Sequence, residues 1–523
     1  GLLLCAIASF AQAKYVFYFI GDGMGVNQIC GTETYLASLE GRIGVTPLLM
    51  AQFPHTAMAV TNSATNGVTD SAAGGTALSC GYKTKNGCLG VLKDGETRIK
   101  SIAEMARDCG KAVGVATSVS VDHATPGAFY AHVPNRSMYN KIGHQLIEAK
   151  FDYHAGSDFL KPDNKEDSTE ANLYTLCKEA GYTIAKGYKD YQKKAAKADR
   201  IILLQTDKAN KRDHSALPYA IDRRKDDMTL ADVTRAGINF LTKKDRGQGF
   251  FLFVEGGKID WSCHANDAAT TFKEVMDMDQ AVRVAYEFYQ QHPDETLIVI
   301  TADHETGGIA LGTGAYKLDL SVLANQRMST ADYTKHVREI REQYGRNLTW
   351  DVMHADLQEN WGFWDKVNLN EHQTDRMRRA YDGLMSGMAQ GSQTLYQNDD
   401  AVCDAARRTL AEIALVNWAS TGHSNGIVPV FAIGAGSERF SGLIDNTDVP
   451  DDDDDEDSDT SEPEDDEDED EADSEPQEPK EKGAFVVRDD DDDDEPVVRP
   501  GRNPKRRVVT TGATAVPVKD YLK

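Results

Sequence analysis

Three acidic residues each follow a run of apolar residues in this chain of 523 residues. They are Asp22, Glu255 and Asp303. A single acid in such a place is more often part of a turn. Three carboxylates at one edge of one sheet would repel each other unless cations neutralised them. The pattern therefore predicts metal ions at that edge.

Pairs of aspartate and histidine with the spacing of metal ligands support this prediction. Asp260 and His264 stand four residues apart, which places them on one face of a helical turn; alone, they are equally well interpreted as a surface ion pair. Asp303 and His304 are adjacent, and His423 lies just before the last apolar run. Mixed carboxylate and imidazole ligands suit zinc, and oxygen-only positions suit magnesium.

A serine at a predicted helix start is the candidate nucleophile. Asp70 and Ser71 precede the small residues Ala-Ala-Gly-Gly-Thr-Ala. Free N–H groups and the dipole at a helix N-terminus favour an oxyanion or a phosphate. The alternative is an N-cap serine that opens a tightly packed helix. Because no Gly-x-Ser-x-Gly motif surrounds Ser71, its ionisation would need a metal rather than a histidine.

Residues 121–136 add two polar candidates. Thr125, which precedes Pro126, offers a hydroxyl ligand or a helix cap. Arg136 offers a guanidinium fork that can hold two oxygens of a phosphate or of a carboxylate. Most arginines are solvated surface residues, but beside predicted metal ligands a phosphate clamp is the better interpretation.

Buried strands that alternate with helices must position these residues. Apolar runs rich in β-branched and aromatic side chains predict strands at 15–20, 112–117, 201–204, 250–254, 297–301 and 428–433. Helical patterns lie between them, at 98–108, 267–290 and 401–418. The alternation predicts an α/β fold with a mostly parallel sheet covered by helices on both faces. Ligands of such sheets collect outside the carboxyl ends of the strands, where the three acids stand.

The first 13 residues have the pattern of a secretory signal. They are apolar and end in Ala-Gln-Ala, so the mature chain is expected to begin at Lys14. No later segment has the ~20 continuous apolar residues of a membrane span. We therefore expect a protein without a transmembrane segment, exported to the periplasm or secreted. In such an oxidising compartment Cys80 and Cys88 could close a short disulfide loop.

Composition separates a body from a tail. Residues 14–450 form the predicted main domain, in which 316–391 are a mostly helical insertion beside the site. Residues 451–498 are rich in Asp, Glu, Ser and Pro, which predicts a disordered acidic segment, and residues 499–523 are basic. The tail accounts for most of the formal net charge of −27. The body therefore has an ordinary charge balance, which favours neither a nucleic-acid-binding nor a membrane-surface protein.

Six separated motifs resemble, in residues and in order, those of the alkaline phosphatase family. They are Asp22, Asp-Ser-Ala-Ala-Gly-Gly-Thr-Ala, the segment from His-Ala-Thr-Pro to Asn-Arg, Val-Glu-Gly-Gly-Lys-Ile-Asp, Thr-Ala-Asp-His-Glu-Thr-Gly-Gly and a late Gly-His. The resemblance covers the body before the acidic tail. It implies a doubly wound α/β sandwich, two zinc ions, a third site that usually holds magnesium, and a phosphoserine intermediate.

The resemblance also implies a role for each candidate residue. The ligands of the zinc that positions the attacking water would be Asp260, His264 and His423. The other zinc would be surrounded by Asp22, Asp303, His304 and the Ser71 oxygen. The third metal would be held by Asp22, Thr125 and Glu255. Arg136 would hold two phosphate oxygens, and His123 and Trp261 would stand beside the phosphate, where the enterobacterial branch of the family has aspartate and lysine.

The implied function is metal-dependent hydrolysis of small phosphate monoesters by a homodimer that needs no nucleic-acid partner. Two alternatives stay open. A phosphodiesterase or sulfatase of the same superfamily would share the two metals, although Arg136 and the third-metal ligands favour monoesters. A non-enzymatic exported protein would bind calcium through the acidic tail, although the intact ligand set argues against it.

Overall fold

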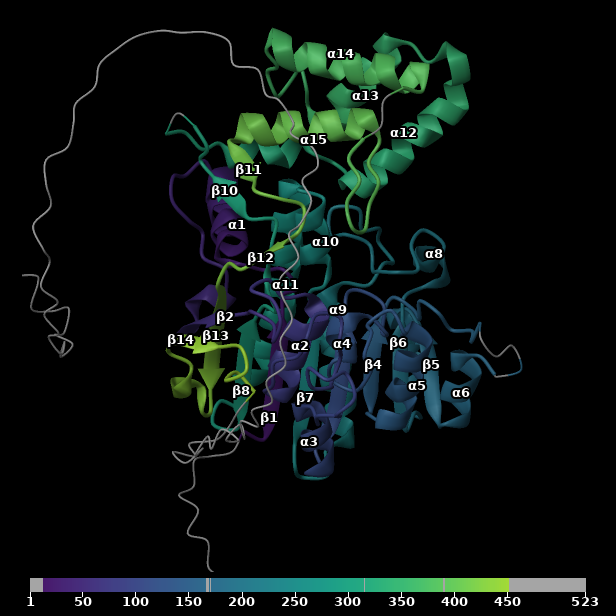
Figure 1. Cartoon of the computed structure of the whole chain (residues 1–523), viewed down its shortest axis with the longest axis vertical. Coiled ribbons are helices and arrows are strands. Elements are labelled where there is room, and N and C mark those ends of the chain that lie inside the picture. The colour runs from purple at the N-terminus through teal and green to yellow at the C-terminus, as the bar shows by residue number, and fades with distance from the viewer. Residues whose placement is uncertain (1–12, 166–168, 170, 315, 389–390, 451–523) are drawn as a thin grey trace, which may run out of the picture. The chain divides into compact units, whose positions relative to one another are not determined.

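The computed structural model describes residues 13–450, except 166–168, 170, 315 and 389–390. Its main element is a ten-stranded sheet with helices on both faces (Figure 1). The predicted secretory signal and the acidic and basic segments from residue 451 lie outside the described residues.

The sheet has the strand order β14-β2-β13-β8-β1-β7-β3-β4-β6-β5. Its strands are β1 (Tyr15–Ile20), β2 (His55–Val60), β3 (Ala112–Thr117), β4 (Tyr153–Gly156), β5 (Tyr182–Lys186), β6 (Arg200–Leu204), β7 (Phe250–Glu255), β8 (Thr296–Thr301), β13 (Val428–Gly434) and β14 (Gly442–Asp445). All neighbouring pairs are parallel except the two that β13 makes with β2 and β8. The predicted α/β fold with a mostly parallel sheet is confirmed.

The register of the three central strands brings the strand-end acids together. Ile20 at the end of β1 pairs with Glu255 of β7 and with Thr301 of β8. Asp22 and Asp303 each follow their strand by two residues. The three carboxylates therefore stand at one carboxyl edge of the sheet, as the sequence predicts.

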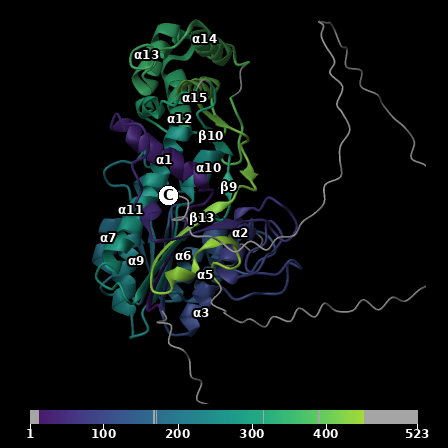
Figure 2. The same ribbon diagram turned by 90° about the vertical axis from the view of Figure 1, so that its left-hand side faces the viewer.

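Helices cover both faces of this sheet. The helices in this part of the chain, not all of which lie on a face of the sheet, are α1 (Val26–Leu39), α2 (Ser71–Cys80), α3 (Ile102–Asp108), α4 (Ala124–Gly127), α5 (Tyr139–Ala149), α6 (Leu173–Glu179), α7 (Tyr188–Lys194), α8 (Asp207–Asn210), α9 (Leu230–Lys244), α10 (Lys258–His264) and α11 (Ala268–Tyr289). Figure 2 shows α7, α9 and α11 on one face and α2, α3, α5 and α6 on the other. The central strands, such as β3 and β7, are buried on both faces, which explains their continuous apolar runs.

A second group of helices lies beyond the carboxyl edge of the sheet, at the top of Figure 1. It contains α12 (Thr330–Tyr344), α13 (Trp350–Trp361), α14 (Glu371–Ser386), α15 (Ala401–Ala414) and two 3-10 helices, η2 (Leu320–Asn325) and η3 (Gly345–Asn347). These helices share an apolar core that includes Tyr333, Trp361 and Val402 and continues to Tyr35 on α1 and Phe272 on α11. The segment predicted as a helical insertion supplies most of this layer, packed on two helices of the main sheet.

Two short antiparallel pairs connect this layer to the sheet. In one, β10 (Ile309–Leu311) pairs with β11 (Val416–Trp418), and in the other, β9 (Glu305–Thr306) pairs with β12 (His423–Ser424). The second pair places His423 opposite Thr306. It therefore brings the late histidine next to the segment that follows β8.

The six predicted strands are all present, with ends that differ by at most one residue. The helix predicted over 401–418 is wrong at its end, because Leu415 adopts a left-handed conformation and the next three residues form β11. The helix predicted over 98–108 begins only at Ile102, after a capping box between Ser101 and Glu104. Cys80 and Cys88 are free thiols here, and the Cys88 thiol donates to the Pro134 carbonyl over 3.2 Å.

Candidate active site

The strand-end carboxylates are buried and only partly satisfied. Asp22 is 1% exposed, and Glu255 and Asp303 are fully buried. Each has one oxygen without a hydrogen-bond partner among the described residues, and so does Asp260. Buried polar atoms are nearly always paired, so four such oxygens together indicate a cation-binding site. The donor set therefore fits the divalent metals that the sequence predicts.

Electrostatics lead to the same conclusion. Burial, reinforced by the carboxylates of Asp303 and Asp260, raises the pKa of Asp22 well above its usual value. Burial and the same kind of repulsion raise the pKa of Asp303, and burial raises that of Glu255 to about 7. Bound cations would reverse these shifts and keep the carboxylates ionised at neutral pH.

One ligand cluster consists of Asp260 and His264 on α10 and His423 on β12. His264 Nε2 lies 3.2 Å from Asp260 Oδ2 and 3.2 Å from His423 Nε2. His423 Nε2 lies 3.6 Å from Asp260 Oδ1. The Nδ1 atoms of the two histidines face the carbonyls of Thr421 and Thr69. Because a carbonyl only accepts, each Nδ1 donates and each Nε2 lone pair faces the cluster, as in metal-binding histidines.

A second cluster surrounds His304. Its Nε2 lies 3.4 Å from Asp22 Oδ1, 3.4 Å from Asp303 Oδ2 and 3.2 Å from Ser71 Oγ. Its Nδ1 lies 3.2 Å from Thr306 Oγ1, whose proton is donated to Asp260 Oδ1 over 2.6 Å. The Nδ1 of His304 must therefore be the donor to Thr306, which leaves Nε2 free to bind a cation. Thr306, whose role the sequence does not reveal, thus orients ligands in both clusters.

Ser71 is the first residue of α2 and is completely buried. The N-cap is Asp70, whose Oδ1 accepts from Ala73 N over 3.0 Å, so Ser71 is not the cap itself. Small residues let the helix approach the acids: a Cβ at Gly74 would lie 2.8 Å from the Asp303 carbonyl oxygen. Ser71 Oγ therefore stands between the positive end of a helix and the second ligand cluster.

A match to the family model of alkaline phosphatase extends over residues 13–452, which is most of the chain. The chain belongs to the alkaline phosphatase family. It is 31% identical to alkaline phosphatase 3 of Bacillus subtilis over 84% of this chain and 87% of the relative, and 29% identical to alkaline phosphatase 4 over the same shares. These relatives show that the protein is a phosphatase.

Solved structures of alkaline phosphatases have the same fold. The cold-active enzyme from a psychrophilic Shewanella matches with a TM-score of 0.69 and 26% identity, over 83% of this chain and 98% of that one. The Thermus thermophilus enzyme matches with a TM-score of 0.64 and 26% identity, over 84% of this chain and 90% of that one. The third is a histidine-to-aspartate variant of the alkaline phosphatase from the Antarctic bacterium TAB5, with magnesium bound in its M3 site. It matches with a TM-score of 0.58 and 25% identity, over 84% of this chain and 96% of that one.

The three residues expected to hold a third metal, Asp22, Thr125 and Glu255, interact with one another. Thr125 lies in α4, and its hydroxyl is 3.4 Å from Asp22 Oδ2. Glu255 accepts a hydrogen bond from Thr117 through Oε2, while its Oε1 has no partner among the described residues. Thr125 is not a helix cap, because the N-cap of α4 is His123.

The Arg136 side chain is largely buried, with 19% of it exposed. Its Nη1 donates to Asp70 Oδ2 over 3.0 Å. Since Asp70 Oδ1 also accepts from the Ala73 and Gly87 amides, the carboxylate that caps α2 holds the guanidinium beside Ser71. This placement agrees with a phosphate clamp.

His123 and Trp261 meet with an edge-to-face contact of 5.9 Å between ring centroids. Burial and the Arg136 charge lower the pKa of His123 to about 3, so its imidazole is neutral at physiological pH. The sequence does not predict their neighbour Tyr396, whose ring stacks on Trp261 at 4.6 Å. Only the folded chain brings Tyr396 to this site, because it lies far from every motif in the sequence.

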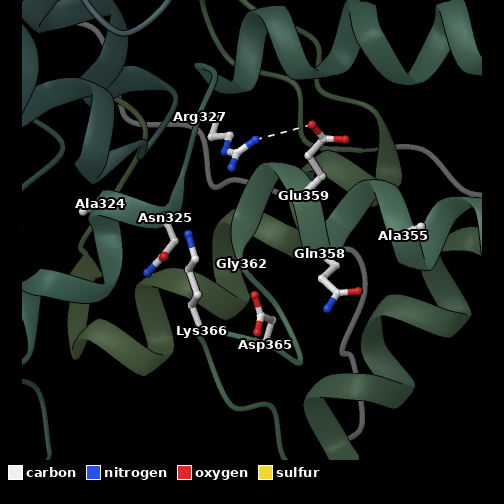
Figure 3. A pocket seen from close by; sticks show the side chains of 9 residues that line it. All are labelled: Ala324, Asn325, Arg327, Ala355, Gln358, Glu359, Gly362, Asp365 and Lys366. Atoms are coloured by element: carbon white, nitrogen blue, oxygen red, sulfur yellow. Dashed lines mark hydrogen bonds and ion pairs between the residues drawn. The ribbon is translucent and has the colours of Figure 1, made fainter.

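Two open cavities of this phosphatase are separate from the site. One, of about 300 Å³, lies in the helical layer between η2 and α13; its lining includes Arg327 and Glu359, whose side chains face each other 3.4 Å apart (Figure 3). The other, of about 480 Å³, includes Asp158 and Tyr174. Neither is lined by a predicted site residue. Among the described residues, no helix is long and apolar enough to cross a membrane.

Proposed function

We propose that this phosphatase hydrolyses phosphate monoesters through a phosphoserine formed on Ser71. One observation carries the proposal: the Ser71 hydroxyl, at the start of α2, lies 3.2 Å from His304 within a group of buried, unsatisfied carboxylates. Cations held by these carboxylates would favour ionisation of the hydroxyl without a separate general base.

The two ligand clusters would hold two zinc ions, and the Asp22, Thr125 and Glu255 oxygens would hold a third metal, for which we propose magnesium. The donor chemistry supports this assignment, because the clusters mix imidazole with carboxylate and the third set is oxygen only. The magnesium-bound TAB5 variant supports the third metal. When bound, these ions supply positive charge that favours the ionised Ser71 oxygen and the departing alkoxide.

The residues of the chain then carry out two displacements at phosphorus. In the first, Ser71 Oγ forms a bond to phosphorus while the bond to the alcohol oxygen breaks. In the second, water attacks the phosphoserine and its bond to Ser71 breaks, which releases inorganic phosphate. Arg136, fixed by Asp70, binds the phosphoryl oxygens through both displacements. Neutral His123 and Trp261 border the phosphoryl group.

The substrate class is tested by comparing three compounds with metal-loaded protein: a phosphate monoester, a phosphate diester and a sulfate ester with the same alcohol. We expect the highest kcat/KM for the monoester, because Arg136 and a third cation suit its extra negative charge. A higher kcat/KM for the diester or the sulfate would instead assign the chain the activity of another branch of the superfamily.

Arg136→Ala should lower kcat/KM for a monoester by about 10²-fold, because it removes a preorganised charged donor to the developing anion. Arg136→Lys should recover only part of this loss, since an ammonium cannot reproduce the fork. Steady-state kinetics and inhibition by inorganic phosphate measure both effects. Arg327→Ala, in the helical layer, is the matched control and should resemble the wild type. Unchanged phosphate inhibition in both Arg136 variants would remove Arg136 from the phosphate site.

We further propose that the protein is exported to the periplasm or secreted and acts as a homodimer. The support is the secretory pattern of the first 13 residues and the family resemblance. The acidic segment 451–498 is proposed to bind calcium weakly through its carboxylates.

Truncation after Pro450 should leave phosphatase activity nearly unchanged, because every proposed ligand precedes that residue and β14 ends at Asp445. The shortened protein should lose low-affinity calcium binding and migrate as a less anionic species. Activity assays and calcium titration of both forms check these results. If truncation after Pro450 gave inactive or insoluble protein while deletion of 451–482 alone did not, the segment after Gly483 would be needed by the main domain.

A further inference from the structure

We propose that Tyr396 is a substrate-binding residue, whose hydroxyl donates a hydrogen bond to a phosphoryl oxygen opposite Arg136. The inference rests on the proposed function and adds to it a second donor to the phosphate, supplied by the helical layer. No sequence motif contains this residue.

Contacts with three site residues fix the position of the Tyr396 ring. The ring stacks on Trp261 with 4.6 Å between centroids and an angle of 17° between the planes. It also meets His264 edge-on at 5.4 Å and His123 at 6.3 Å. Tyr396 therefore bridges a proposed zinc ligand and the two residues expected beside the phosphate.

The side chain of Tyr396, with its hydroxyl, lies within electrostatic range of charged groups of the site. It interacts electrostatically with Arg136 and with the carboxylates of Asp260 and Asp22. No hydrogen bond from this hydroxyl to another described residue is found. A phenol so placed has its proton available for an anion bound between the guanidinium and the metal ligands.

Trp261 gives Tyr396 a rigid support. Trp261 belongs to a small apolar cluster with Tyr219, Val119 and Ala216, against which Tyr396 packs. The ammonium of buried Lys258 lies 3.4 Å above the Tyr219 ring and 5.1 Å from the Trp261 ring. These cation–π contacts stiffen the support.

The backbone around Tyr396 is anchored to the helical layer. Residues 392–399 form a tight turn, in which Asp399 N donates to Ser392 O over 2.9 Å and Thr394 N to Gln397 O over 2.8 Å. Gln397 Nε2 donates to Thr330 Oγ1 at the start of α12 over 2.7 Å. Asp399 pairs with Arg407 of α15 at 3.8 Å. The helical layer thus holds Tyr396 over the site.

Tyr396→Phe is the decisive variant, because it removes the hydroxyl and keeps the ring that stacks on Trp261. A purely structural role for the ring would leave this variant like the wild type. Leu395→Ala is the matched control, since the neighbouring Leu395 is 66% exposed and makes no contact used in this argument. Metal content is measured in all three proteins, and we expect it to be unchanged.

Calorimetry with inorganic phosphate tests the inference without turnover. The Kd of metal-loaded Tyr396→Phe should rise about 10-fold, the typical effect of losing a hydrogen bond to a charged group, while Leu395→Ala binds as the wild type does. KM for a monoester should rise in parallel. A wild-type phosphate Kd in Tyr396→Phe would overturn the inference. A wild type that binds phosphate but hydrolyses no monoester would overturn the proposed function, while the binding comparison would still decide the role of Tyr396.

Discussion

Ser71→Ala is expected to lower kcat for a phosphate monoester by about 10³-fold or more, because a methyl group cannot attack phosphorus. Alanine suits the first turn of α2, so the helix and its Asp70 cap should persist. The substitution adds no charge, and the carboxylates and imidazoles of the two clusters are untouched. Metal content should therefore stay near that of the wild type. Kinetics and elemental analysis of the same preparation measure the two effects together.

Ser79→Ala is the matched control for this change. Ser79 lies two turns further along α2, is equally buried, and donates to the Ala128 carbonyl over 2.8 Å. Its loss should lower stability slightly and leave kcat almost unchanged. Wild-type turnover by Ser71→Ala would exclude Ser71 as the nucleophile.

Removal of the metal ions should abolish activity, and zinc together with magnesium should restore it. Asp22 and Asp303 each keep one buried oxygen without a partner among the described residues. Without cations these carboxylates would repel the phosphate anion and would not favour ionisation of Ser71. His304→Ala and His423→Ala should each lose about one zinc per chain, since each removes one imidazole from a different cluster. Metal analysis after dialysis checks this, with His372→Ala as the control on the exposed side of α14.

The two histidine variants should also fail to recover full activity when zinc is added back. Acidic pH should release metal from the wild type, because imidazole and carboxylate ligands bind a cation only when deprotonated. Two tightly bound zinc ions in either variant would contradict the ligand assignment. Full activity of metal-free protein would contradict the whole metal account.

The central fold could be predicted from the sequence because its strands are buried on both faces. The sequences of β1 and β3 are continuous apolar runs, and both strands begin and end at the predicted residues. β2 could not be recognised in this way, because its side chains alternate between buried and partly exposed. β11 could not be predicted, because α15 ends just before Leu415, which has a left-handed conformation. Leucine is not a residue that signals a turn, so the sequence does not reveal the end of the helix.

The site could be predicted to the extent that its residues lie in local motifs at strand ends and helix starts. Asp22, Glu255 and Asp303 meet because parallel strands in register end at one edge. Thr306 and Tyr396 could not be assigned roles, since the contacts of Thr306 with Asp260 and of Tyr396 with Trp261 join residues more than 40 positions apart in the chain. The residues that cover the site depend on how the helical layer packs on the rest of the chain. No local sequence pattern encodes that packing.

Acid quenching of the metal-loaded enzyme during turnover of a phosphate-labelled monoester tests the central claim most directly. Acid stops the hydrolysis of phosphoserine already formed, because that step needs a bound metal and an ionised water, so label present at the moment of quenching is retained. The account predicts one labelled peptide with the label on Ser71, and none in Ser71→Ala. Label on another residue, or hydrolysis without label on Ser71 under any quench condition, would contradict it.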